Sequence, residues 1–157
     1  MVEKRLKGNR KDMEEKIIDT FHALNCPGAF DRRFNLIFTN KRIIGDFVGS
    51  NVGGFLAGGL VGMLLTDKHY KNKTLDVDME NEPDKIISRH KKNFYIKYDD
   101  VEEALLYKKY VQFNLICDCG IIGDHPAFFF SKEQRDDIES VVMKILPDKT
   151  IIKYKKK

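Results

Sequence analysis

Residues that could do chemistry are few in this sequence and stand far apart. None of the four histidines lies in a phrase that also holds a nucleophile and an orienting acid. These histidines are His22, His69, His90 and His125. The phrase Asp124-His125-Pro126 is typical of a turn, and the adjacent carboxylates of Asp99 and Asp100 would point to opposite sides of an extended chain. The sequence therefore predicts no enzymatic activity and no bound cofactor.

The three cysteines, Cys26, Cys117 and Cys119, form no even-numbered disulfide framework and no Cys-x-x-Cys pair. Cys117 and Cys119 are two residues apart, so on a strand they would share one face. A structural zinc site needs four ligands, however, and no histidine stands at ligand spacing from them. We expect free thiols and no metal. Because no apolar signal segment follows the charged N-terminal residues, we also expect a cytoplasmic protein.

Charge is distributed unevenly along the 157 residues. The chain carries 28 Lys and Arg against 24 Asp and Glu, a net charge of +4. Residues 148–157 hold five lysines and one aspartate, whereas residues 13–147 are slightly acidic. A basic face for nucleic acid is therefore not expected. The pattern indicates one soluble domain, residues 13–147, between a charged flexible lead-in (1–12) and a solvated basic tail (148–157).

Several short strands followed by one helix must position these residues. Apolar runs at 34–39 and 42–48 flank Asn40-Lys41, which is typical of a tight hairpin. Residues 110–117 alternate apolar and polar side chains, which predicts a strand with Cys117 on its buried face. Ser131 and Gln134 form a capping box before an apolar stripe, which predicts an amphipathic helix ending at Pro147. The stripe consists of Ile138, Val141, Val142, Ile145 and Leu146.

This order of elements and three phrases resemble the bacterial and archaeal pleckstrin-homology-like (PH-like) domains. The phrases are LIFTNKRII at residues 36–44, EPDKIISRHKKNFYIKYDDVEEALL at residues 82–106, and the helix that begins at Ser131. The resemblance implies a mainly β fold with one C-terminal helix. It implies a partly open barrel of about seven strands in two near-orthogonal sheets, with the first strand at residues 16–25 and the helix closing one end.

The resemblance does not supply an activity. Some proteins of the wider fold bind phosphoinositide headgroups through basic residues of the first hairpin loop. The matching loop here, residues 26–34, offers only Arg32 and Arg33 and no lysine. Specific phosphoinositide binding is therefore not expected. Since some prokaryotic members resemble oligomer-forming scaffolds, we expect a binding or scaffolding module.

A glycine-rich apolar insert, residues 49–73, interrupts the resemblance. Seven of the eleven glycines lie between residues 45 and 62. A helix over residues 51–65 would contain five glycines, each costing about 1 kcal/mol relative to alanine, so it would need a packing partner. As a helix, the apolar residues 52–65 would be about 21 Å long, too short for a hydrocarbon core of about 30 Å. The insert also lacks the endings of phosphate-binding loops.

Two hypotheses for the insert follow from its composition. In the leading one, it packs on its own domain or mediates self-association or contact with a protein partner. In the alternative, the insert and the basic tail together bind an anionic membrane surface, and the protein is peripheral to the membrane. The candidate contact residues are Gly54, Phe55, Gly58, Leu60, Gly62, Leu64, Lys68, Tyr70 and Lys71.

Overall fold

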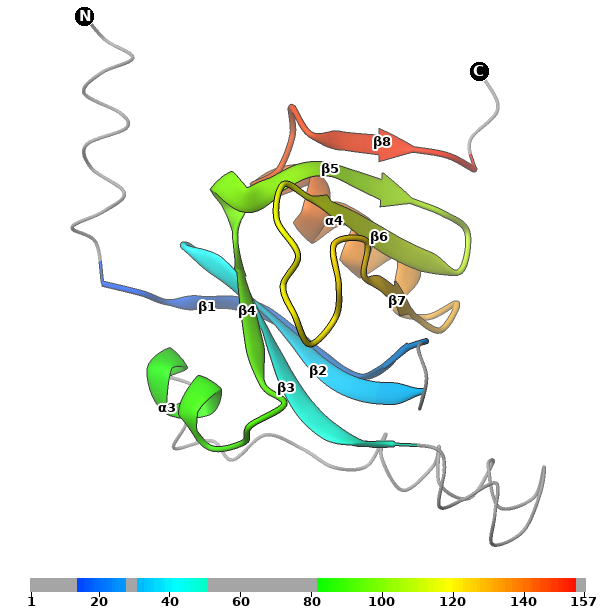
Figure 1. The fold of residues 1–157 in the computed structure, drawn as a ribbon. Coiled ribbons are helices and arrows are strands. Elements are labelled where there is room, and N and C mark those ends of the chain that lie inside the picture. The colour runs from blue at the N-terminus through cyan, green and yellow to red at the C-terminus, as the bar shows by residue number, and fades with distance from the viewer. Residues whose placement is uncertain (1–13, 28–30, 51–81, 155–157) are drawn as a thin grey trace, which may run out of the picture.

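The computed structural model describes residues 14–27, 31–50 and 82–154. These residues form a mainly β fold with two α-helices (Figure 1). The helices are α3 (Pro83–Ser88) and α4 (Arg135–Ile145), and a 3₁₀ turn, Tyr98–Asp100, joins β4 to β5. The strands are β1 (Ile17–Cys26), β2 (Arg32–Thr39), β3 (Arg42–Ser50), β4 (Phe94–Lys97), β5 (Val101–Leu106), β6 (Tyr110–Leu115), β7 (Ala127–Phe129) and β8 (Thr150–Ile152).

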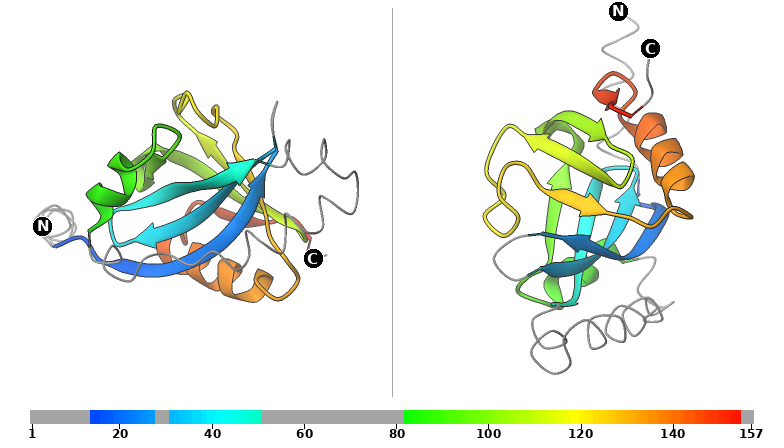
Figure 2. Two further views of the ribbon diagram at one scale, coloured as in Figure 1. Left: turned by 90° about the horizontal axis from the view of Figure 1, so that it is seen from below. Right: turned by 90° about the vertical axis from the view of Figure 1, so that its right-hand side faces the viewer.

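The strands form one mixed, open sheet in the order β4-β3-β2-β1-β7-β6-β5-β8. Neighbouring strands are antiparallel, except that β8 runs parallel to β5. β1 and β7 share only the residue pair Asn25–Phe129, so the sheet divides there into β1–β4 and β5–β8. Figures 1 and 2 show the second part crossing over the first. β4 and β8 form the two edges of the sheet.

The main core lies between the two parts of the sheet and α4. Alternation along β2 directs Phe34, Leu36 and Phe38 into this core, where all three are fully buried. The Phe34 ring contacts the rings of Phe94 and Phe128 edge-on, with centroids 5.0 and 6.5 Å away. The core therefore joins β2 to β4 and β7, which are distant in the sheet.

α4 packs its apolar stripe against this core. Ser131 N donates a hydrogen bond to Gln134 Oε1 (3.0 Å), and Gln134 N donates one to Ser131 Oγ (3.3 Å). These reciprocal bonds are those of a capping box, and they close the turn of residues 131–134 that comes directly before α4. Ile138 and Val142 are fully buried, and the helix ends shortly before Pro147, which cannot continue it. The predicted terminal helix is confirmed, as are the hairpin at Asn40-Lys41 and the first strand.

Three predictions need correction. The sheet has eight strands in one continuous order, rather than about seven strands in two sheets. The basic tail is not wholly a solvated end, because residues 150–152 form β8; Lys149 O accepts a hydrogen bond from Ala104 N (2.8 Å), and Lys153 N donates one to Leu106 O (2.8 Å). β6 ends at Leu115, so Cys117 is exposed and does not lie on the buried face of a strand.

Candidate functional site

The candidate contact residues of the insert, Gly54 to Lys71, lie outside the described residues, so their role stays a prediction. The flanking elements are described. β3 ends at Ser50, and α3 begins at Pro83 and contacts β3. Residues 51–81 are therefore attached at both ends to one strand of the sheet. We call β3, α3 and residues 89–93 the base of the insert (Figure 1).

A buried carboxylate, that of Asp46 on β3, is the centre of the base. Asp46 is 3% exposed. Arg89 forms an ion pair with it from the end of α3, with Nε donating to Oδ1 (3.1 Å). Asn93 Nδ2 donates to the same oxygen (3.2 Å), and Asn35 Nδ2 donates to Oδ2 (3.2 Å). A buried charge is tolerated when it is paired and hydrogen-bonded in this way, so the network fastens the end of α3 to the sheet.

Asn93 extends this network to the backbone on both sides. Its Nδ2 also donates to Ile86 O in α3 (2.6 Å), and its Oδ1 accepts from Phe47 N in β3 (2.7 Å). The side chain is buried, so its loss would leave several buried polar groups without partners. Asn93 therefore fixes the distance between the helix and the strand.

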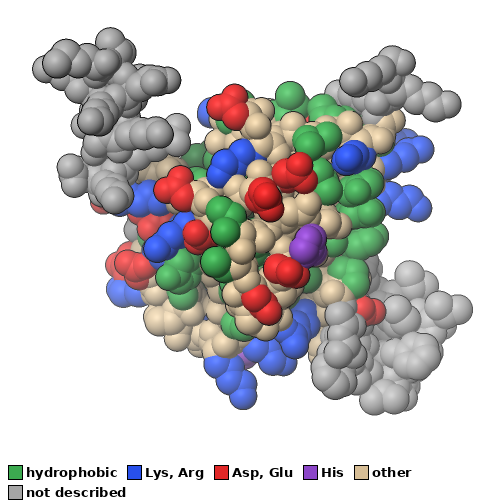
Figure 3. Space-filling model, turned by 45° about the horizontal axis from the view of Figure 1, so that its top comes forward, with side chains coloured by type: hydrophobic (Ala, Val, Ile, Leu, Met, Phe, Trp, Pro, Cys, Tyr) green, Lys and Arg blue, Asp and Glu red, His purple; other side chains and the backbone are tan. Residues whose placement is uncertain are grey.

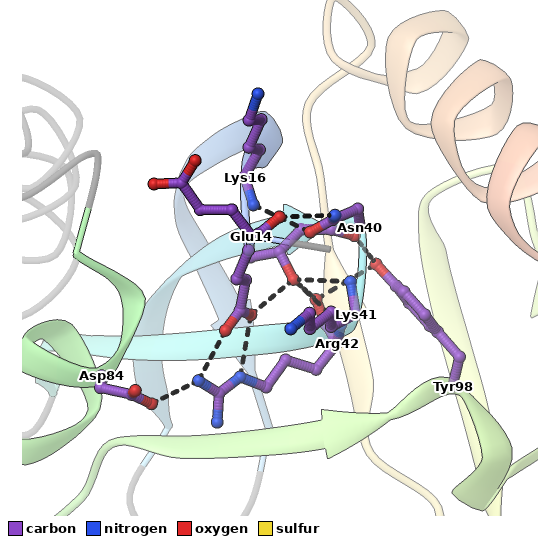
Figure 4. A network of polar contacts seen from close by, with 9 residues as sticks. Glu14, Lys16, Asn40, Lys41, Arg42, Asp84 and Tyr98 are labelled. Carbon is purple, nitrogen blue, oxygen red and sulfur yellow. Dashed lines mark hydrogen bonds and ion pairs between the residues drawn. The ribbon is translucent and has the colours of Figure 1, made fainter. Parts of the chain in front are cut away.

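A second polar network fastens the beginning of α3 (Figure 4). Arg42 donates from Nε to Glu15 Oε1 (2.9 Å) and from its NH2 group to Glu15 Oε2 (2.8 Å) and Asp84 Oδ1 (2.5 Å). Burial alone would lower the pKa of Arg42, but its hydrogen bonds with Glu15 and Asp84 raise it. Thr39 Oγ1 donates to Glu15 (2.8 Å), and Tyr98 Oη donates to Thr39 O (2.5 Å). Arg42 therefore links α3 to the segment before β1 and to the β2–β3 turn.

An apolar contact completes the attachment of α3. Ile86 is fully buried against Ile37 of β2 and Ile44 of β3, on the face of the sheet opposite the main core. A helix of only six residues has little stability of its own in water. Its position must therefore come from these three attachments, namely Arg42, Asp46 and the isoleucine cluster.

Aromatic and basic side chains from β3 and from residues 90–92 lie together in the base. The rings of Phe47 and His90 stack with centroids 4.8 Å apart. Lys92 Nζ lies 4.6 Å from the centroid of Phe47, and Lys92 N donates to His90 Nδ1 (3.1 Å). Lys91 is exposed. This part of the base is therefore suited to contact an anionic group.

The other residues considered for chemistry are not brought together into one constellation in the described ranges. Burial raises the pKa of the Cys26 thiol to about 11, whereas Cys117 is exposed. The hydrogen bond from His125 (2.7 Å) lowers the pKa of Asp124, and both side chains are largely exposed. Across residues 14–27, 31–50 and 82–154, no group of three or more His, Cys, Asp and Glu side chains is arranged to hold a metal ion. His69 lies outside these ranges.

Neither α3 nor α4, the two α-helices in the described ranges, is long and apolar enough to span a bilayer.

Sequence reasoning missed the residues of the base. Asp46 interrupts the apolar run RIIGDFV. A charged residue inside such a run was the one feature of the sequence that could have indicated a buried, paired carboxylate. Its partner Arg89 is 43 residues away, so the pairing depends on the fold.

Comparisons with known proteins give no family. No family model matches the sequence, and no curated protein matches it. One similar structure is the C-terminal domain of an unknown protein from Leishmania infantum, at 12% identity and a TM-score of 0.47, covering 92% of this chain and 97% of that one. Another is the hSac2 domain from human phosphoinositide phosphatase Sac2, at 10% identity and a TM-score of 0.45, covering 99% of this chain and 88% of that one.

Proposed function

We propose that the protein is a PH-like binding module without catalytic activity, and that it presents residues 51–81 to a second copy of the chain. The PH-like part of the proposal rests on the three sequence phrases at residues 36–44, 82–106 and 131 onward. It is also supported by the crossed arrangement of β1–β4 and β5–β7 with one C-terminal helix packed on the core.

The observation that carries the binding role is the three-point attachment of α3. Arg42, Asp46 and the Ile37–Ile44–Ile86 cluster hold a six-residue helix against β3. A loop needs no such base merely to connect two strands, since long connections add little to the entropy cost of closure. Fixed ends are useful when the segment between them must be presented in one position to a partner.

The composition of the segment indicates what it would contact. Residues 52–65 carry no charged side chain and five glycines, and such a surface is stable in water only when another surface covers it. Glycines at positions 54, 58 and 62 would allow close approach of a second, similar segment. A second copy of the chain supplies such a segment.

A second candidate is contact with an anionic membrane surface, and the basic residues of the base favour it. Lys92 lies beside Phe47, and its neighbour Lys91 is exposed. Lys68, Lys71 and Lys73 follow the apolar stretch in the sequence. Each lysine near an anionic leaflet adds about 1 kcal/mol of attraction. The same residues would oppose close contact between two copies unless acidic side chains face them.

The mass of the full chain in solution separates the two candidates. Self-association predicts a mass above 18.3 kDa in light scattering at micromolar concentration, and a decrease toward that value in Leu60→Gln/Leu64→Gln. Ile116→Gln serves as the control, because Ile116 is 65% exposed and lies outside the base. A wild-type chain that is strictly monomeric and soluble at these concentrations would exclude the self-association proposal.

A further inference from the structure

Three aromatic rings from two different parts of the sequence stack in a row at one end of the sheet. Tyr107 and Tyr110 flank the β5–β6 turn, and Phe129 ends β7. The centroids of Tyr107 and Tyr110 are 4.4 Å apart, and those of Tyr110 and Phe129 are 4.8 Å apart, with interplanar angles of 19° and 26°. Phe129 is 38% exposed, and both tyrosines are partly exposed. Tyr110 in β6 pairs with Phe129 in β7, and this pairing completes the row. The row of rings therefore depends on the fold.

Lysines surround these rings. Lys108 and Lys109 form the exposed tip of the β5–β6 turn, and Lys153 is placed beside Tyr107 because its N–H bonds Leu106 O (2.8 Å). No ion pair involving these three lysines is found among residues 14–27, 31–50 and 82–154. We call Tyr107, Lys108, Lys109, Tyr110, Phe129 and Lys153 the hairpin-end surface. Figure 3 shows hydrophobic and Lys or Arg side chains gathered along this edge of the molecule.

Acidic neighbours reduce the positive charge of this end without cancelling it. The adjoining residues 131–137 carry two cations and three acids, and Glu139 accepts a hydrogen bond from Tyr154, next to Lys153, so two of the three lysine charges are offset. Asp136 in that segment also lies 3.6 Å from Arg135. The sequence then continues after Tyr154 with three more lysines.

The stacking geometry limits where a nucleic-acid base could lie. Two nearly parallel rings within 5 Å of Tyr110 must cover its two faces, so this ring has no face left for a base, and only the outer rings, Tyr107 and Phe129, could take one. All three rings keep part of their surface exposed. Aromatic edges with polar tips, flanked by lysines on a protruding turn, are the side chains that lie at the headgroup level of a bilayer.

We propose that the hairpin-end surface binds anionic lipid surfaces, independently of residues 51–81. In Figure 1 the β5–β6 turn lies on the right of the view and α3 on the left. One protein could self-associate through residues 51–81 while its hairpin-end surface touches a membrane. The occupant we assign is a bilayer that carries acidic phospholipid, because a protruding turn offers no groove for a peptide.

Co-sedimentation of the full chain with phosphatidylcholine vesicles, with and without phosphatidylserine, tests this proposal. Binding is expected only with phosphatidylserine. Lys108→Gln/Lys109→Gln should weaken it about thirtyfold, from the usual attraction of two lysines near an anionic surface. Lys97→Gln/Lys144→Gln removes the same charge from exposed positions elsewhere and should have a much smaller effect. Leu60→Gln/Leu64→Gln should leave vesicle binding unchanged.

Each other outcome overturns the proposal. Equal losses in the two lysine variants would mean that only net charge matters. Loss of binding in Leu60→Gln/Leu64→Gln alone would assign the membrane contact to the insert. Binding of single-stranded oligouridylate that depends on Lys108 and Lys109, in the absence of vesicle binding, would replace lipid by nucleic acid. The two lysine variants leave residues 51–81 unchanged and are compared in the same oligomeric state, so the proposal can fail separately from self-association.

Discussion

Gly45 in β3 is the position at which the fold leaves least room for a side chain. An added Cβ would lie 2.1 Å from both Cε1 and Cζ of Phe94, and 2.7 Å from Cδ1. The Phe94 ring has little room to retreat, because the rings of Phe34 and Phe128 lie against it at centroid distances of 5.0 and 6.1 Å. Gly45→Ala must therefore displace either the β3–β4 pairing or the Phe94 ring. Because β3 is part of the base of the insert, such a displacement would also disturb the base.

The expected cost of Gly45→Ala is about 3 kcal/mol in the free energy of unfolding, at the upper end of typical overpacking. With a urea m-value of about 1.5 kcal/mol/M, the midpoint of urea unfolding should fall by about 2 M at unchanged slope. Circular dichroism or intrinsic tyrosine fluorescence of the full chain measures this midpoint.

Two further variants isolate the contact with Phe94. Phe94→Leu in the Gly45→Ala background should recover more than about 1 kcal/mol relative to the sum of the single effects, because the smaller side chain removes the clash. Gly120→Ala should cost only about 1 kcal/mol, since its φ of 72° is strained for alanine but no atom lies within 4 Å. A Gly45→Ala variant within about 0.5 kcal/mol of wild type, or strict additivity with Phe94→Leu, would refute the reasoning.

Other variants and treatments test the Arg42 network and the two cysteines Cys26 and Cys117. Glu15→Ala should lower the free energy of unfolding by about 1–3 kcal/mol, because it leaves the largely buried Arg42 with fewer partners. Asp84→Ala should cost under about 0.5 kcal/mol, because the Asp84 side chain is 91% exposed. Equal losses of the two variants in chemical denaturation would contradict the Arg42 network. Burial raises the pKa of Cys26 to about 11 from its ordinary value of 9.0, so stability should be lost as pH rises from about 9 toward 11, and Cys26→Ala should reduce that loss. At neutral pH a thiol reagent should modify Cys117 in the native protein and Cys26 only after unfolding, and rapid native labelling of Cys26 would contradict its burial.

The local parts of the fold could be predicted from the sequence. Asn40-Lys41 between two apolar runs indicated the β2–β3 hairpin, although Asn40 does not adopt the positive φ that such a turn often uses. Locally the turn is held by Thr39 Oγ1, which accepts hydrogen bonds from Lys41 N (3.1 Å) and Arg42 N (3.0 Å). Ser131 and Gln134 indicated α4 because the capping bonds involve residues only three positions apart. In each case the interaction that decides the structure lies within a few residues.

The remaining elements depend on pairings that the local sequence does not contain. β8 is a three-residue strand in a lysine-rich segment, and its residues are ordered by β5, more than forty positions earlier. Likewise, Asp46 becomes a buried anchor only when Arg89 and Asn93 reach it. The hairpin-end surface also needs Phe129 and Lys153 to lie beside the β5–β6 turn. Burial and charge patterns of single segments cannot specify such contacts.

We have proposed that this protein is a binding module that self-associates through residues 51–81. Sedimentation equilibrium of the unmodified full chain over a range of micromolar concentrations tests this proposal most directly. We predict a mass that rises with concentration above 18.3 kDa toward a closed oligomer, and a return to 18.3 kDa in Gly58→Leu, because a leucine would prevent close approach of two glycine-rich segments. A mass of 18.3 kDa at every concentration, with the wild-type protein soluble, would contradict the claim.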